Sequence, residues 1–389
     1  MFENILGRDE LVSQLRGEIM GRTLPPAILL HGPQFEGKLS VALEVARALT
    51  CLNGTAKWDC ACESCSQQRS LLHPHTVMVG GRYFSLEIRA ARDALLRKPS
   101  KGTQFLFLRA IRKLTRRYDS FLWEGDEGKL KRAAGHIDRL SDLLAAIEPP
   151  ADPAQLEAKT VESAAEASEA LAAAVSPDGV GVQTVRRLSS MLTMSADSRA
   201  KIVIIERADA MGESARNALL KTLEEPPADS YLLLLAENRA AILPTILSRV
   251  REVEFRPRPA DVHEEVCRRI FHDSTTGTLR RYFLAYDDQD YEAQGRLAAD
   301  VVAAMAQGGK FVEKVLAGSS RVSREALRLF AEELTHEAAA ALKAGELDVV
   351  AAGRIRGAVH GALHRSERLN LSADLAYLDL IVALEGHAG

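Results

Sequence analysis

The stretch KIVIIERADAMGESARNALLKTLEEPP, residues 201–227, indicates the fold of this chain more directly than any other. Its β-branched run from Ile202 to Ile205 predicts a strand buried on both faces, as in a parallel sheet covered by helices. Glu206 and Arg207 follow at the carboxyl end of that strand, where doubly wound α/β proteins hold phosphates and metals. We therefore predict an α/β fold, a parallel sheet flanked by helices, with these two side chains at its functional edge.

The tip of this strand lacks the acids that nucleotide hydrolysis needs. In a P-loop ATPase the tip reads Asp-Glu, in which the Asp holds Mg²⁺ and the Glu polarises the attacking water. Here the second position is Arg207, and a guanidinium cannot act as a base at any ordinary pH. The strand therefore has the frame of an ATPase strand without its hydrolytic chemistry.

A P-loop-like segment lies near the amino terminus. The sequence GPQFEGKL, Gly32 to Leu39, follows an apolar run and precedes a helical pattern, and it fits G-x-x-x-x-G-K. Leu39 then replaces the Ser or Thr whose hydroxyl would hold Mg²⁺. Gly32, Gly37 and Lys38 are still candidate phosphate contacts, because anion binding uses loop amides and the helix amino terminus. We expect a loop that can hold ATP or ADP but does not hydrolyse it; the alternative is a relic loop kept for packing.

Four of the five cysteines crowd into fifteen positions. In a chain of cytosolic type such a cluster indicates metal ligation rather than disulfides. Four thiolates suit one structural, tetrahedral Zn²⁺, and the candidate ligands are Cys51, Cys60, Cys62 and Cys65. The C-x-C step from Cys60 to Cys62 is tight for such a site, and His73 and His75 are alternative ligands. Cys267, which stands apart, is predicted to be a core residue.

Further apolar runs at 76–80 and 231–238 predict two more strands. Residues 83–176, about a hundred residues of helix-forming composition, lie between core strands as an insertion. We interpret the Ala/Glu-rich end of this insertion as a solvated helix or a flexible linker. Its basic stretch RAIRKLTRR, residues 109–117, is predicted to be a solvated helix face, with contact to nucleic acid or a partner as the alternative.

Composition excludes some classes of protein. The 389 residues carry a formal net charge of −3, so we expect no strong independent binding to nucleic acid. Without an apolar run of about 18 residues, membrane spanning and secretion are not expected, and a cytoplasmic location is.

Two long and specific groups of residues carry a family resemblance. NALLKTLEEPP at 217–227, together with LPTILSRV at 243–250, resembles the bacterial DNA polymerase III clamp-loader subunits of the AAA+ class. The resemblance implies that Arg249 is a trans-acting arginine finger, although Val250 replaces the usual Cys of the Ser-Arg-Cys signature. It also places Glu237 where ATPase members carry a Thr or Asn sensor.

Within that family the chain is most similar to the δ′ type, through GVQTVRRL at 181–188, the missing acids and the altered P-loop. This resemblance implies a non-motor stator that helps to load the sliding clamp onto primed DNA and presents Arg249 to a neighbouring ATPase subunit. The implied partners are the γ/τ and δ subunits and, through the hetero-oligomeric complex, the sliding clamp and primer-template DNA. Two alternatives stay open: a γ/τ-type motor with Lys38 on the phosphates and Glu206 on Mg²⁺, and a zinc-bearing nucleic-acid-binding module that uses the insertion.

The resemblance also implies the domain organisation. Residues 1–256 would form the AAA+ P-loop domain, with the zinc module at 51–65 and the helical insertion at about 83–176. A helical lid at 257–310 and a helical collar for oligomerisation at 311–389 would follow, with 368–384 as the last collar helix.

Overall fold

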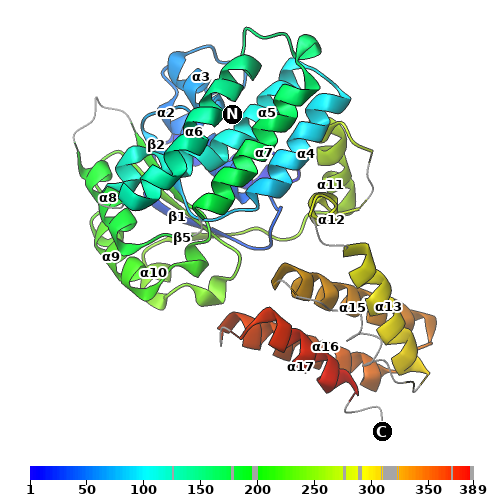
Figure 1. The fold of residues 1–389 in the computed structure, drawn as a ribbon. Helices are drawn as coiled ribbons and strands as arrows, with labels where there is room; N and C mark the ends of the chain where they lie inside the picture. Colours follow the sequence, from blue (N-terminus) through cyan, green and yellow to red (C-terminus); the bar gives the residue numbers. More distant parts are fainter. Residues whose placement is uncertain are drawn as a thin grey trace. The chain divides into compact units, whose positions relative to one another are not determined.

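Five parallel strands form the sheet at the centre of the computed structural model (Figure 1). The strands are β1 (Ala27–His31), β2 (Thr76–Val79), β3 (Lys201–Ile205), β4 (Ser230–Ala236) and β5 (Arg251–Glu254), in the spatial order β2-β3-β4-β1-β5. Each neighbouring pair is parallel, so the carboxyl ends of all strands lie at one edge. The predicted α/β fold with a parallel sheet is confirmed.

The structure describes residues 1–124, 127–176, 179–194, 200–274, 277–287, 291–307, 309, 322, 324–368 and 371–385. The chain divides into two units, Met1–Tyr286 and Asp287–Gly389. No helix in these ranges is both long and apolar enough to cross a membrane.

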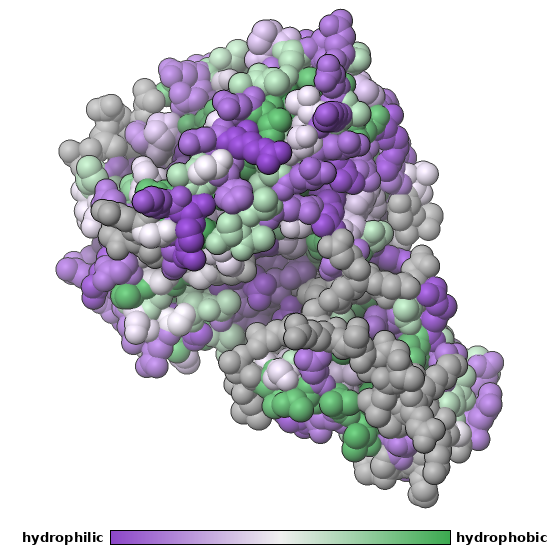
Figure 2. Space-filling model, in the orientation of Figure 1, coloured by the Kyte–Doolittle hydropathy of each residue, from purple (hydrophilic) through white to green (hydrophobic). Residues whose placement is uncertain are grey.

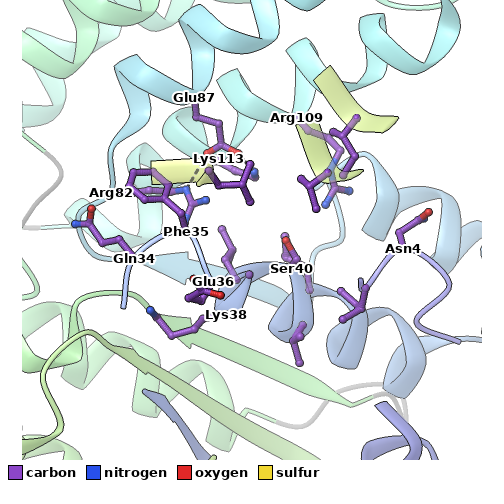
Figure 3. A pocket seen from close by; sticks show the side chains of 18 of the residues that line it. Asn4, Gln34, Phe35, Glu36, Lys38, Ser40, Arg82, Glu87, Arg109 and Lys113 are labelled. Carbon is purple, nitrogen blue, oxygen red and sulfur yellow. Dashed lines mark hydrogen bonds and ion pairs between the residues drawn. The ribbon is translucent and has the colours of Figure 1, made fainter. Parts of the chain in front are cut away.

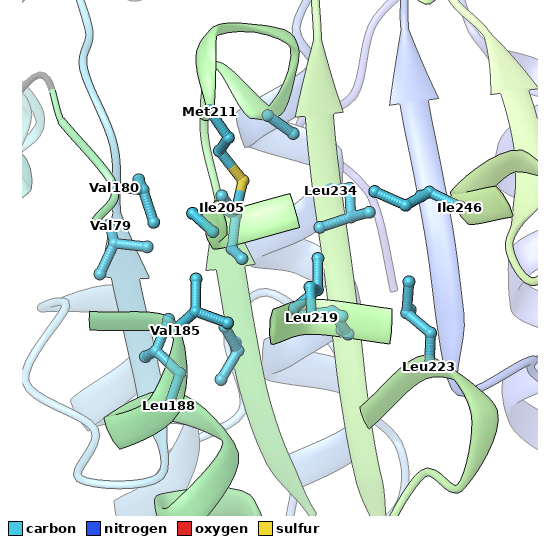
Figure 4. Close-up of a cluster of buried hydrophobic side chains, with 14 of the residues drawn as sticks. Val79, Val180, Val185, Leu188, Ile205, Met211, Leu219, Leu223, Leu234 and Ile246 are labelled. Carbon is cyan, nitrogen blue, oxygen red and sulfur yellow. The ribbon is translucent and has the colours of Figure 1, made fainter. Parts of the chain in front are cut away.

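Helices cover both faces of the sheet, which explains the unbroken apolar strands. Along β3, Val203 and Ile205 pack against α8 (Val182–Thr193) and α9 (Glu213–Glu224), as Figure 4 shows for Ile205. The alternate residues Ile202 and Ile204 face the other side, with α1 (Asp9–Met20) and α2 (Lys38–Thr50). Successive side chains of a strand point to opposite faces, so a strand covered on both sides must be apolar throughout.

Strand β5 was not predicted from the sequence. It has only four residues, REVE, and its side chains are partly or fully exposed. It pairs with β1 alone at the edge of the sheet, and charged residues on a short edge strand discourage pairing with other chains. Such a strand carries no run of buried apolar residues from which it can be predicted.

The insertion is a helical unit with its own hydrophobic core, formed by α4 (Phe84–Arg97), α5 (Lys101–Thr115), α6 (Glu127–Ile147) and α7 (Ala158–Ala174). The interpretation of the Ala/Glu tract as a solvated helix or linker is wrong. Helix α7 buries Val161, Ala164 and Leu171 in this core, because its small alanines let the neighbouring helices approach closely.

Three short helices complete the first unit beside the insertion and the sheet. They are α3 (Glu63–Arg69), α10 (Pro244–Leu247) and α11 (Ala260–Val266), followed by a π-helical turn at Cys267–Phe271 and by α12 (Leu279–Leu284). Helices α11 and α12 belong to the first unit, although both lie in the segment predicted as a lid, 257–310. The three-part division of the chain therefore stays a prediction.

The second unit is helical in its described part. Its helices are α13 (Tyr291–Ala306), α15 (Arg324–Ala344), α16 (Val349–Arg368) and α17 (Ala373–Glu385). They share one apolar core, with Phe330 and Tyr377 at its centre. Of the predicted last collar helix, residues 369 and 370 lie outside the described residues, residue 368 ends α16, and residues 373–384 lie in α17.

Candidate functional site

A pocket of about 440 Å³ lies at the carboxyl edge of the sheet. The P-loop-like segment and the start of α2 line one side, and α4 and α5 of the insertion line another. Figure 3 shows Lys38 and Glu36 across the pocket from Arg109 and Lys113. The insertion therefore contributes directly to the site that the P-loop motif predicted.

The P-loop conformation depends on its glycines. Gly32 has φ +138, and a Cβ there would lie 2.2 Å from the carbonyl oxygen of Phe255, so only glycine fits. Gly37 has φ +84 and stands at the amino-terminal cap of α2, which starts at Lys38. The loop thus retains the strand–turn–helix geometry that places backbone N–H groups at a helix amino terminus.

Lys38 is turned back onto its own loop. Its Nζ donates to the carbonyl oxygen of Gly32 at 2.5 Å and to that of Pro33. Burial lowers the pKa of Lys38 to about 8, although the Glu237 and Asp209 carboxylates oppose this shift. The amine that would contact a phosphate is therefore engaged with backbone oxygens.

Two further loop residues fasten the P-loop to the rest of the first unit. The ring of Phe35 lies 4.3 Å from that of Tyr83 and 5.0 Å from that of Phe283, which is on α12. Glu36 is buried, and its carboxylate accepts from Arg8 at 2.9 Å and from Nε of Arg258 at 3.1 Å. These contacts hold the P-loop against other segments of the first unit.

Glu206, the acid at the tip of β3, is not available to a metal ion. It is 5% exposed, one carboxylate oxygen accepts from Arg82 at 2.7 Å, and the other accepts from Arg117. Arg207 lies 3.5 Å from the carboxylate of Glu237 at the tip of β4. Glu237, the predicted sensor position, also accepts from Gln34 at 2.8 Å, so it faces the P-loop.

The ion-pair network continues into the insertion through Glu87. This residue accepts from Arg82 at 2.8 Å and from Lys113. Burial alone would raise the pKa of Glu87, but the two cations outweigh it and lower the pKa to about 2. Burial lowers the pKa of Lys113 to about 8 despite the adjacent carboxylate.

The basic stretch 109–117 therefore faces inward, and its interpretation as a solvated face is wrong. Arg117 is 3% exposed and binds Glu206, and Arg112 is 7% exposed and binds Glu148. The spacing of charges along a helix does not show which of them pairs with a carboxylate on another element. Arg112, Lys113 and Arg117 of this stretch pair with glutamates inside the protein, which argues against the alternative that the stretch contacts nucleic acid.

Arg249 stands outside the pocket, directly after α10. It is exposed, and its Nη2 donates to Glu224 of α9 at 2.8 Å while its Nη1 donates to the carbonyl oxygen of Thr245 at 2.8 Å. It is not among the residues that line the pocket. Its position does not serve the site of its own chain.

The four clustered cysteines converge, and their sulfur atoms all lie within 4.8 Å of one another. The Sγ atoms of Cys51 and Cys60 are 3.8 Å apart, which is about the separation that a tetrahedral Zn–S distance of roughly 2.3 Å requires. Backbone N–H groups of Ala56 and Cys65 donate to the sulfurs of Cys51 and Cys62. The tight C-x-C step therefore does not prevent a four-thiolate metal site.

The alternative ligands and the fifth cysteine are used differently. His73 is buried; its Nε2 lies 3.1 Å from the hydroxyl of Ser64, and its Nδ1 accepts from the backbone of His75. Neither histidine belongs to the metal-type cluster found in the described residues. Cys267 is 1% exposed within an apolar cluster, as a core residue should be.

Sequence reasoning missed the residues that occupy Glu206. Arg82 and Arg117 lie 124 and 89 positions from it along the chain. No motif or period marks such pairs. The one available signal was the number of arginines in the insertion beside a P-loop that lacks metal ligands.

Comparisons with known proteins identify the family of this chain. The family model described as "DNA polymerase III, delta subunit" matches residues 7–116 and 103–259, which together span about two thirds of the chain. The DNA polymerase III subunit delta′ of Bacillus subtilis (strain 168) is 32% identical over 143 residues, 36% of this chain and 42% of that protein. The subunit delta′ of Haemophilus influenzae is 44% identical over 71 residues, 18% of this chain and 22% of that protein.

These matches span less than half the length of the curated relatives. Among solved structures, a DNA polymerase III gamma subunit-related protein from Thermotoga maritima is 16% identical with a TM-score of 0.30, covering 54% of this chain and 81% of that chain. A likeness at this level indicates neither the fold nor the function of this chain.

Proposed function

Because the chain belongs to the DNA polymerase III delta′ family, we propose that it is a non-motor stator subunit of a bacterial clamp loader. In this role it helps to load the sliding clamp onto primed DNA. It does so within a complex with γ/τ and δ subunits, and it meets the clamp and the primer-template DNA through that complex.

The observation that carries the proposal is the state of Glu206. A γ/τ-type motor would need this carboxylate for Mg²⁺, but both of its oxygens accept from the arginines Arg82 and Arg117. Leu39 supplies no hydroxyl for the metal, and Arg207 cannot polarise water. These three features argue against the motor alternative.

Arg249 supports the other half of the proposal, a trans arginine finger. An arginine that reaches the γ-phosphate of a neighbour must lie on the surface and be free to move. Arg249 has a side chain that is 34% exposed, and its acidic partner Glu224 is 50% exposed. Exposed ion pairs are worth about 0–1 kcal/mol, so this pair can be exchanged for a phosphate on a neighbouring subunit.

The remaining assignments follow from the same family. We infer that Cys51, Cys60, Cys62 and Cys65 hold one structural Zn²⁺, a closed site with no open position for catalysis. We also infer that residues 1–256 form an AAA+ domain that is followed by a lid at 257–310 and a collar at 311–389.

A stripe of exposed apolar side chains on α17 supports the collar. Leu375, Leu378 and Val382 are 54%, 39% and 61% exposed and recur at helical spacing. Figure 2 shows a hydrophobic patch over α16 and α17. Exposed apolar patches of this kind mark protein–protein contacts.

The test is ATP hydrolysis. The purified chain alone should not hydrolyse Mg·ATP, whereas a reconstituted complex with γ/τ and δ subunits should. Arg249→Ala in this chain should lower hydrolysis at the adjacent motor site on the order of 10³-fold, by analogy with the arginine fingers of GTPases. The matched control is Arg256→Ala, since the Arg256 side chain is 80% exposed. Hydrolysis by the isolated chain that Lys38→Ala abolishes would overturn the proposal.

A further inference from the structure

Some cations that line the pocket make no ion pair with a carboxylate. The others pair with glutamates, namely Arg8, Arg82, Lys113, Arg207 and Arg258. In the described part of the chain, three other lining cations have no such ion pair, namely Lys38, Arg109 and Arg269. Lys38 is satisfied by loop carbonyls, so Arg109 and Arg269 are the cations left to meet an anion.

Arg109 is the more enclosed of the two. It projects from α5 of the insertion, donates one hydrogen bond to the carbonyl oxygen of Arg69, and lies over the ring of Phe105 at 5.4 Å. Burial lowers its pKa to about 10, although the Glu44 and Glu87 carboxylates oppose this shift. A guanidinium has five donors in a fixed fork, so one carbonyl uses only part of its capacity.

Arg269 lies on the next element. It belongs to the π-helical turn Cys267–Phe271, which packs against α5, and it is exposed at the pocket. Leu106, one helical turn before Arg109, joins the apolar cluster of this π-helical turn. The two arginines therefore border the pocket from adjoining elements.

Two aromatic rings also line the pocket. Trp58 and Phe105 both line it, with ring centroids 6.4 Å apart in an edge-on arrangement. Its volume of about 440 Å³ lies within the range of roughly 300–1,000 Å³ that holds a small organic ligand. Aromatic rings and two guanidiniums in the lining of one pocket suit a ligand with a flat ring at one end and a phosphate at the other.

A metal ion is not needed for this arrangement. Glu206 is taken by arginines, and Leu39 supplies no hydroxyl, so a bound phosphate would be neutralised by side-chain cations only. We propose that the pocket binds a nucleotide without Mg²⁺ and that its phosphate group is held by Arg109 of the insertion and Arg269 of the π-helical turn, not by Lys38. This inference goes beyond the stator role and does not depend on it.

The first test uses the full chain and isothermal titration with ADP, in EDTA and in Mg²⁺. The two dissociation constants should agree within about twofold, and ADP should bind at least about tenfold more tightly than inorganic pyrophosphate, because only ADP brings a ring. Binding that requires Mg²⁺, equal affinity for pyrophosphate, or no binding at millimolar ADP would each overturn the proposal.

The second test shows which side chains of the pocket hold the phosphate. Arg109→Met and Arg269→Met should each weaken ADP binding about tenfold, the loss expected for one charge-assisted hydrogen bond. Lys38→Met should change it less than about threefold, and Arg139→Met, an exposed arginine on α6, should leave it unchanged. Loss of binding in Lys38→Met with full binding in Arg109→Met and Arg269→Met would place the ligand on the P-loop and contradict the proposal.

A loss of stability in one variant does not prevent these titrations from deciding the outcome. Arg109 hydrogen-bonds to the end of α3, so its variant can lose stability, and thermal unfolding must accompany the titration. Arg269 is exposed and has no ion pair in the described residues, and its variant therefore decides the outcome if Arg109→Met does not fold. Arg249 plays no part in either titration, so failure here is distinguishable from failure of the stator proposal.

Discussion

Glu206 and Glu224 each pair with arginine, in opposite surroundings. The Glu206 side chain is 7% exposed and lies between Arg82 and Arg117, whose side chains are 12% and 2% exposed. The Glu224 side chain is 50% exposed and holds Arg249, which is 34% exposed. In the pocket the charges neutralise one another inside the protein, whereas at the surface the arginine stays available to another molecule.

Under the proposed function, this difference lets a chain that lacks hydrolytic residues of its own take part in hydrolysis at a neighbouring subunit. Removing one partner of a buried ion pair leaves an unpaired charge in a poorly solvated place, which costs about 3–5 kcal/mol. An exposed pair contributes about 0–1 kcal/mol and rearranges easily. The following predictions test whether the two regions differ in this way.

The largest effect should come from the proposed zinc site at the four clustered cysteines. Cys65→Ser, or removal of metal by a chelator, should lower the free energy of unfolding on the order of 5 kcal/mol, because zinc ligation in small modules is worth roughly 10–16 kcal/mol. Arg47 of α2 contacts the Cys65 sulfur at 3.9 Å, so amide protection should fall in α2, α3 and α5. Helices α9 and α10 next to Arg249 should keep theirs.

The control for this prediction is the same chelator added to the Cys65→Ser protein, which should change nothing further. Hydrogen exchange measured by mass spectrometry gives the amide protection of each helix in both proteins. Equal loss of protection in α2 and α9 would show that the pocket and the Arg249 surface are not separate in stability.

The second prediction concerns Glu206. Glu206→Gln should lower the free energy of unfolding by about 4 kcal/mol, because Arg82 and Arg117 lose their shared carboxylate. Urea denaturation of the full chain measures this change. A loss below about 1 kcal/mol would mean that the pocket network is no stronger than an exposed pair.

The third prediction concerns acid stability. The pKa of Glu87 is lowered from its ordinary value of 4.5 to about 2, so its ionised form stabilises the folded state above pH 4.5 and this contribution is lost as the pH falls toward 2. At about 1.4 kcal/mol per unit, the loss is about 3 kcal/mol. Glu87→Gln should remove this part of the pH dependence.

Unfolding curves of both proteins between pH 5 and pH 2 provide the measurement. Their difference in free energy should shrink as the pH falls. Parallel curves would show that Glu87 has an ordinary pKa and that Arg82 and Lys113 do not hold it.

The smallest effect should come from Glu224. Glu224→Gln should change the free energy of unfolding by less than about 1 kcal/mol, because this pair with Arg249 is exposed. Urea denaturation beside Glu206→Gln makes the comparison direct. Comparable losses in the two variants would remove the distinction between the regions.

The sequence was sufficient for features that depend on local pattern. The β-branched run at Ile202–Ile205 predicted β3, and the cysteine spacing predicted the cluster. Features that depend on tertiary contacts were not predictable. The arginines on Glu206 come from distant positions, and the alanine-rich α7 was mistaken for a solvated segment because burial of small residues leaves no apolar pattern.

The most direct test of the account places one substitution in each region of the same assembly. Clamp loaders are reconstituted with this chain as wild type, as Lys38→Ala, or as Arg249→Ala, and ATP hydrolysis is measured with DNA and clamp present. The account predicts unchanged hydrolysis for Lys38→Ala and a loss on the order of 10³-fold at the adjacent site for Arg249→Ala. Lost hydrolysis in Lys38→Ala with normal hydrolysis in Arg249→Ala would contradict it, because the chain would then be a motor that uses its own pocket.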